Sequence, residues 1–161
     1  MTYCRTKYIG IDPGAGGGIA VIDEKGKISA FKCPKTTDEI SALFDVIVGD
    51  TAPSEIKLLM ERVWARPTNA VRAAFSYGVN YGQWLGIVSS REIEMQTVIP
   101  IEWIKWIGCP KSLKRDVRKR WLKEKAKELF PELKKVTLAT SDAILICQYA
   151  REEYFNEKEH E

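Results

Sequence analysis

The sequence predicts a single α/β domain built on a mixed five-stranded sheet with helices on its faces. Three short apolar segments joined by tight turns open the chain, which is typical of an antiparallel meander. Two further apolar segments follow, each preceded by a helical stretch, which favours parallel pairing. The chain has 161 residues, of which 45% are hydrophobic and 29% charged, as expected for one globular domain. We expect this domain to cover residues 1–155, with a charged, frayed tail at 156–161.

The predicted strands are short apolar runs bounded by glycine, proline or charged residues. They cover residues 8–12, 19–23, 28–33, 56–61 and 94–99. The first and the fourth of these strands each end in an acid, Asp12 and Glu61. Because a crossover helix separates the fourth strand from the meander, we expect it to lie parallel to the first strand.

The predicted helices are recognised by their caps and by apolar residues at helical spacing. The first runs from Thr36 or Thr37 to a stop near Gly49, and the others cover residues 68–89, 100–107, 112–130 and 142–155. Thr36 or Thr37 can cap the first helix, with Glu39 in its first turn. The second helix carries three glycines at four-residue spacing, which cost about 1 kcal/mol each relative to alanine. We therefore expect close packing of this face on the sheet, or alternatively on a second subunit.

Composition and charge argue against a membrane or secreted protein and favour contact with nucleic acid. The longest apolar runs are too short to span a bilayer, and the N-terminus does not resemble a signal peptide. The four cysteines are scattered and are expected to be free thiols in a reducing compartment, so we expect a cytoplasmic protein. Residues 111–127 contain nine basic and two acidic residues. This imbalance favours contact with a phosphate polymer over a merely solvated helix face.

Three acids occupy positions where they can meet. Asp12 and Glu61 end two strands that are predicted neighbours, and Asp142 begins the last helix, which can pack over them. Clustered carboxylates repel one another unless a cation lies among them, and their oxygens suit Mg²⁺ or Mn²⁺. Two such ions about 3.5 to 4 Å apart can catalyse phosphodiester cleavage. The alternative gives each acid a separate role, in a turn, an ion pair and a helix N-terminus.

Several segments resemble, in the same order along the chain, the motifs of RuvC Holliday-junction resolvases of the phage type. These segments are IGIDPG at 9–14, LLMERV at 58–63, FSYG at 75–78 with YG at 81–82 and WLG at 84–86, LFP at 129–131 and SDAILI at 141–146. The resemblance implies an RNase H-like fold, a homodimer and Mg²⁺-dependent nicking of four-way DNA junctions. It also implies that Asp12, Glu61 and Asp142 are metal-binding and catalytic. A strand with Asp-x-Gly also opens actin-like ATPases, but this chain lacks room for their second nucleotide-binding half.

The sequence departs from the RuvC pattern just before Asp142. RuvC proteins usually carry another acid three residues earlier, and phage members often place an Asp-His pair nearby, whereas residues 137–141 contain neither. Thr137, Thr140 or Ser141 is a possible substitute ligand. One metal site is then weak, or its ligand comes from elsewhere, or the protein binds junctions without cutting them well. An RNase H-like nuclease for flaps, forks or RNA–DNA hybrids is a further alternative.

The candidate DNA-contacting residues lie near the acids and in the basic segment. Trp64 lies three residues after Glu61, where resolvases of this family carry an aromatic that can enter a junction, although a core tryptophan is equally compatible with the sequence. The predicted phosphate contacts are Arg62, Arg66, Arg72, Lys114 and Arg118. Trp103 and Trp106 are predicted core residues. His160 falls in the tail and is expected to have no role.

Overall fold

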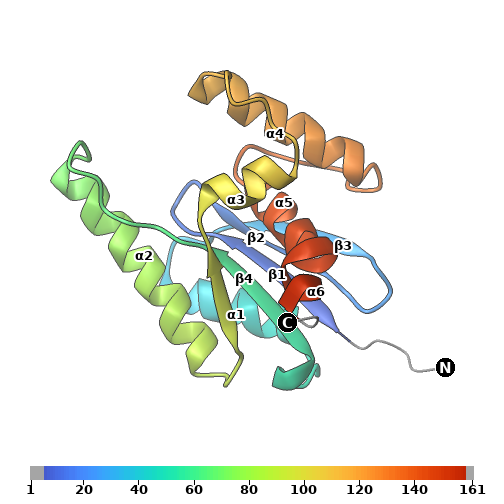
Figure 1. Ribbon diagram of the computed structural model, residues 1–161. Helices are drawn as coiled ribbons and strands as arrows, with labels where there is room; N and C mark the ends of the chain where they lie inside the picture. Colours follow the sequence, from blue (N-terminus) through green and yellow to red (C-terminus); the bar gives the residue numbers. More distant parts are fainter. Residues whose placement is uncertain (1–5, 159–161) are drawn as a thin grey trace.

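The protein is a five-stranded mixed sheet with helices on both faces (Figure 1). The computed structural model describes residues 6–158. The strands are β1 (Lys7–Asp12), β2 (Gly18–Ile22), β3 (Ile28–Lys32), β4 (Ile56–Glu61) and β5 (Met95–Val98). Their order across the sheet is β3-β2-β1-β4-β5. The first three strands are antiparallel, whereas β4 runs parallel to both β1 and β5. The predicted fold class is therefore confirmed.

The helices follow the predicted order, with some shifts at their ends. They are α1 (Thr37–Val48), the 3₁₀ turn η1 (Pro53–Glu55), α2 (Val71–Ser89), α3 (Pro100–Trp106), α4 (Arg115–Leu129), α5 (Ser141–Tyr149), the π-helical turn η2 (Ala150–Tyr154) and α6 (Phe155–Lys158). The second predicted helix starts three residues late, because Asn69 N–H donates to the Arg66 carbonyl in a turn. The predicted tail is helical as far as Lys158, and His160 lies outside the described residues.

Two apolar cores lie on opposite faces of the sheet. Alternate residues of a strand point to opposite faces, so Ile9 and Ile11 join the core beneath α1 and α2, with Phe44 and Trp84. The other core gathers residues of α3, α4 and α5. Every residue of α5 except Gln148 is buried, and this helix packs directly on β1 and β2. The central position of α5 brings its first turn to the carboxyl end of β1.

The first helix shows the predicted capping box. The Thr36 hydroxyl accepts the Glu39 N–H at 3.2 Å, and a Glu39 carboxylate oxygen accepts the Thr36 N–H at 3.1 Å. These reciprocal bonds satisfy two backbone donors at the helix start. The helix ends at Gly49, as predicted.

The glycine face of α2 does not pack on the sheet, so the prediction that the three glycines allow close packing there is wrong. A Cβ atom added at Gly78, Gly82 or Gly86 would meet nothing within 4 Å. The buried residues of α2 instead include Trp84, whose large side chain lies under the helix and leaves the glycines on the outer side. The alternative expectation, contact with a second subunit, stays a prediction.

Two further expectations concern the cysteines and the membrane. Cys33, Cys109 and Cys147 are buried free thiols, as predicted, and Cys4 lies outside the described residues. Within residues 6–158, no helix combines the length and the apolar character needed to cross a bilayer.

Candidate metal centre

The fold brings the three predicted acids to one edge of the sheet. Asp12 and Glu61 are the last residues of β1 and β4, and the parallel pairing of Ile11 with Met60 places them side by side. Asp142 is buried in the first turn of α5, which crosses β1 at close range. The three carboxylates therefore come from three elements that are far apart in sequence.

The pKa values of the acids show that the carboxylates act on one another. Burial raises the pKa of Asp12 well above its ordinary value, and the charges of Asp142 and Glu61 raise it further. Burial likewise raises the pKa of Glu61, to about 7, with Asp142 adding to the effect. Repulsion among enclosed carboxylates is relieved by protonation or by a bound cation. This cluster therefore has the electrostatic character of a cation site.

The loop after β1 is held tightly around Asp12. A Cβ atom at Gly17 would lie 2.0 Å from the Asp12 carbonyl oxygen, so only glycine allows this approach. Gly17 N–H donates to the Gly14 carbonyl at 3.0 Å, and Gly14 N–H donates to the Asn80 side-chain oxygen at 2.6 Å. Asn80 of α2 thus anchors the loop that begins at Asp12. Sequence reasoning did not identify Asn80, because its partner is a backbone group 66 residues away.

Trp103 holds the carboxylate of Glu61. Its indole Nε1–H donates to Glu61 Oε2 at 2.8 Å, and its side chain is only 1% exposed. Trp103 is a core residue, as predicted, but its hydrogen bond was missed. A signal for it exists in the strand order, because Glu61 pairs with Val98 of β5 and α3 begins two residues later.

Lys119 of α4 enters the acidic cluster. Its ammonium group forms an ion pair with the Asp142 carboxylate, which is 7% exposed. Burial alone would lower the pKa of Lys119, but contact with Asp142 and the charges of Asp12 and Glu61 raise it above its ordinary value. The sequence marked Lys119 only as one of nine basic residues, since helical periodicity does not show which lysine points inward.

The three candidate substitute ligands lie at the start of α5: Thr137 and Thr140 precede the helix, and Ser141 is its first residue. Thr137 N–H donates to the Thr140 hydroxyl at 3.0 Å, and the two threonine hydroxyls are 3.2 Å apart. The Ser141 hydroxyl lies 3.4 Å from an Asp142 carboxylate oxygen. Of the three, Ser141 therefore borders the acidic cluster directly, and a role for any of them as a ligand stays a prediction.

The donor set fits a divalent cation, although the side chains are not arranged around one point. Within residues 6–158, no three histidine, cysteine, aspartate or glutamate side chains are grouped closely enough to hold an ion. Glu61 is turned to Trp103 and Asp142 to Lys119. Three mutually repelling carboxylates with one ammonium partner still leave excess negative charge. Their oxygens are ligands that Mg²⁺ and Mn²⁺ prefer, so Asp12, Glu61 and Asp142 are the residues that would bind the metal.

The candidate DNA-contacting residues differ in how closely they are tied to the acids. Trp64 is 49% exposed, so the alternative of a core tryptophan is wrong. The Arg66 guanidinium lies 5.8 Å from the centroid of the Trp64 ring, and its charge also acts on Glu61. Arg62, Arg72 and Lys114 are exposed, and Arg118 is partly exposed. Their contact with DNA stays a prediction.

We expect Trp103→Phe to raise the pH at which the site binds Mn²⁺. The substitution keeps an apolar ring but removes the donor to Glu61, which lowers the pKa of that carboxyl. Because metal binding requires the ionised carboxylate, the midpoint of Mn²⁺ binding, measured by calorimetry across pH 6–9, should rise by about one unit. Trp106→Phe is the control, since Trp106 packs against Tyr149 in the core. An unchanged midpoint in Trp103→Phe would contradict this role.

No protein-family model and no curated protein sequence matches this chain. Solved structures do match it. Thermus thermophilus RuvC in complex with a Holliday junction substrate aligns over 96% of both chains, with a TM-score of 0.63 and 14% identity. Another Thermus thermophilus RuvC structure covers 91% of this chain and 96% of its own, with a TM-score of 0.53 and 15% identity. The chain therefore has an RNase H-like fold. Within that class, its sheet and helices match those of RuvC.

Proposed function

We propose that this protein is a structure-selective endonuclease that hydrolyses phosphodiester bonds in four-way junctions or other branched DNA. The observation that carries the proposal is the cluster of Asp12, Glu61 and Asp142 on a RuvC-like fold. The solved RuvC structure bound to a Holliday junction substrate supports branched DNA as the ligand. The ordered sequence motifs support a resolvase of the phage type, with Mg²⁺ as the metal and Mn²⁺ as its substitute.

The residues of the site have distinct roles in this mechanism. A bound divalent cation would neutralise charge on the scissile phosphate and make the attacking water more acidic. Asp12, Glu61 and Asp142 would hold the cation, and Trp103 orients the Glu61 carboxylate. Phosphate contacts position the strand without reading its sequence, which suits an enzyme that selects a branched shape.

Aromatic and basic side chains around the acids would hold the opened junction. Trp64 is exposed, with the Arg66 guanidinium over its ring, so the exposed part of the ring would stack on an unpaired base. Stacking of this kind contributes about 1 to 3 kcal/mol per base for any sequence. Arg72 at the start of α2 and Lys114 and Arg118 around the start of α4 supply positive charge for the flanking phosphates.

A second candidate function is junction binding with weak or no cleavage. Two observations favour it: residues 137–141 supply no further acid, and the carboxylates of Glu61 and Asp142 are engaged by Trp103 and Lys119. In this case the protein would recognise the same DNA shape, and the acids would serve mainly to hold a structural cation.

A nicking assay on a panel of DNA substrates tests these functions. The panel contains a four-way junction, a flap, a fork, an RNA–DNA hybrid and a linear duplex, each in Mg²⁺ and in Mn²⁺. We expect paired nicks in the four-way junction. Preferential cutting of flaps, forks or hybrids would instead assign a different RNase H-like nuclease. Tight junction binding without nicking in either metal would support the second candidate, and equal cutting of the linear duplex would exclude the resolvase.

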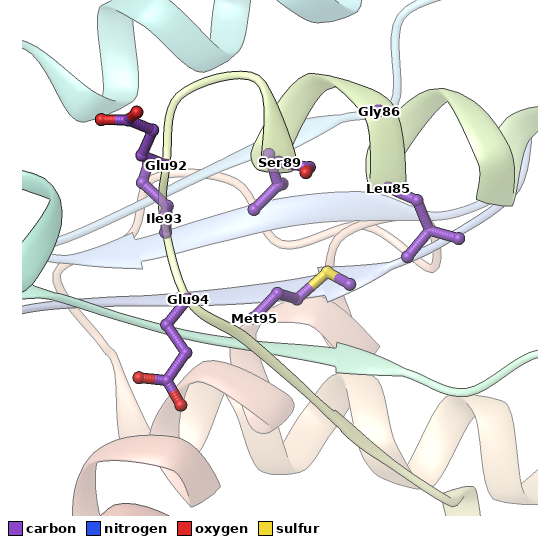
Figure 2. A pocket seen from close by; sticks show the side chains of 8 residues that line it. Leu85, Gly86, Ser89, Glu92, Ile93, Glu94 and Met95 are labelled. Atoms are coloured by element: carbon purple, nitrogen blue, oxygen red, sulfur yellow. The ribbon is translucent and has the colours of Figure 1, made fainter.

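The exposed face of α2 supports a homodimer. Apolar side chains and glycines share this face, which we call the α2 stripe; it consists of Val71, Phe75, Gly78, Val79, Gly82, Leu85 and Gly86. An exposed apolar stripe of this length is typical of an interface. An open pocket of about 660 Å³ continues the stripe between the last turns of α2 and the segment leading into β5 (Figure 2). A two-fold dimer would present one acidic cluster to each of two equivalent junction strands.

We expect Gly82→Lys to convert the dimer to a monomer without unfolding the chain. The lysine side chain meets no atom within the subunit and favours a helix more than glycine does, but it places a charge in the stripe. Analytical ultracentrifugation should report the monomer mass, while the melting temperature of the monomer stays at or above that of the unmodified chain at low concentration. Ser76→Lys, on the same helix but outside the stripe, should remain dimeric. A dimeric Gly82→Lys would place the interface elsewhere.

We propose a cytoplasmic protein, because buried free thiols suit a reducing compartment, and the RuvC-like motifs support a bacterial or phage origin. We further propose that residues 1–155 act as one nuclease domain, because α5 packs on both β1 and β2 at the centre of the sheet.

A further inference from the structure

A positively charged side chain of the protein, Lys119, lies in the acidic cluster of Asp12, Glu61 and Asp142. Lys119 reaches from α4 to Asp142 of α5, and its charge acts on Asp12 and Glu61 as well. The Lys119 side chain is 38% exposed and the Asp142 side chain 7%. The ammonium group therefore approaches the cluster from the solvent side, while the carboxylate that it contacts is enclosed.

Lys119 differs from its neighbours on α4. Two other lysines of this helix form ion pairs within the helix itself, Lys125 with Glu128 and Lys127 with Glu124. Such exposed pairs contribute little to stability. Among the ion pairs of residues 6–158, the Lys119–Asp142 pair is the one that joins α4 to the acidic edge of the sheet. Unlike the pairs within the helix, this contact brings a positive charge to an enclosed carboxylate of another element.

The charges of the cluster balance with one divalent cation. Asp12, Glu61 and Asp142 carry three negative charges when ionised, and the Lys119 ammonium reduces this sum to two. Ala139 stands three residues before Asp142, so that position adds no further negative charge. Enclosed charges need partners of opposite sign. One divalent cation completes the balance, whereas two such cations would leave a net positive charge beside Lys119.

We propose that Lys119 is a charge-balancing residue that takes the place of a second metal ion, so that each chain binds one divalent cation. This inference rests on the proposed metal-dependent function, but it concerns the composition of the site and can be measured without DNA or activity. It also gives the sequence departure before Asp142 a physical reason, since a site with a built-in ammonium group needs fewer acids.

Calorimetric titration of the full chain with Mn²⁺ tests the proposal. The unmodified protein should bind one Mn²⁺ per chain. Lys119→Met should bind its first Mn²⁺ at least about tenfold more tightly or take up a second ion, because the cluster then carries three uncompensated charges. Lys119→Arg keeps the charge and should behave like the unmodified protein. Lys123→Met removes a lysine of the same helix that has no contact with the cluster, and should change nothing.

Each contrary result has a clear meaning. Two Mn²⁺ ions in the unmodified chain, or unchanged or weaker Mn²⁺ binding in Lys119→Met with an intact circular dichroism spectrum, would overturn the role of Lys119. If Lys119→Met does not fold, loss of wild-type stoichiometry in Lys119→Arg would overturn it equally. Absence of Mn²⁺ binding in every variant, the unmodified chain included, would reject the metal-dependent function itself together with the proposal.

Discussion

Asp12→Asn is expected to lower junction nicking by about a thousandfold while leaving junction binding intact. Asp12 ends β1 at the centre of the cluster and is acted on by both other acids. Loss of a metal ligand removes several kcal/mol of transition-state stabilisation, and about 4 kcal/mol corresponds to three orders of magnitude in rate. Single-turnover nicking in Mg²⁺ and Mn²⁺, with binding measured in Ca²⁺, separates the two effects.

The same substitution is expected to stabilise the metal-free protein. Burial and the neighbouring carboxylates raise the pKa of Asp12 well above its ordinary value, so its ionised form is unfavourable in the folded chain. Asparagine is similar in shape and carries no charge. In chelator at pH 8, the melting temperature of Asp12→Asn should therefore exceed that of the unmodified protein, as is common where an active site is strained. Asp50→Asn, an exposed acid outside the site, is the control for both measurements.

Two results would contradict the assignment of Asp12. Nicking at the unmodified rate would show that this acid is outside the reaction. A parallel loss of nicking and of junction binding, with a lower melting temperature, would show that Asp12 has a structural role instead. Lost nicking, retained junction binding and a raised melting temperature together indicate a carboxylate that binds a cation and destabilises the metal-free protein.

The fold could be predicted from the sequence because its local signals agree. The capping box of Thr36 and Glu39 marked the start of α1, and the short apolar runs marked the strands. The crossover rule predicts β4 beside β1, which places Asp12 and Glu61 together, and the structure has this parallel pairing. What failed was the packing of the α2 glycines, because periodicity shows that residues share a face but not what covers it.

The supporting residues of the site could not be predicted in the same way. Asn80, Trp103 and Lys119 each reach a partner that is distant in sequence, at Gly14, Glu61 and Asp142. In sequence, they appear as a polar residue on a helix, a core aromatic and one member of a basic run. Tertiary packing determines which of several similar residues reaches the site. Only the contact of Trp103 could be predicted, because Glu61 pairs with Val98 and α3 begins at Pro100.

Gly10→Ala is expected to destabilise the fold and to disturb the acidic cluster at the same time. A Cβ atom at position 10 would lie 2.4 Å from the Cys147 nitrogen and 2.6 Å from the Ala143 carbonyl oxygen. Both are backbone atoms of α5, so a side-chain rotation cannot relieve the overlap. Overpacking of this kind costs about 1 to 3 kcal/mol, which corresponds to a fall of about 2 to 12 °C in the melting temperature of a chain of this size.

The expected consequence extends from stability to the metal site, because α5 carries Asp142. Moving this helix away from β1 separates Asp142 from Asp12, so Mn²⁺ binding by Gly10→Ala should weaken even at temperatures where the chain is folded. Gly16→Ala is the matched control, since a Cβ atom there meets nothing within 4 Å. A normal melting temperature for Gly10→Ala would mean that α5 does not lie directly on β1. A lower melting temperature with unchanged Mn²⁺ affinity would mean that the position of Asp142 does not determine metal binding. Both changes together would show that one glycine in β1 sets the spacing on which the acidic cluster depends.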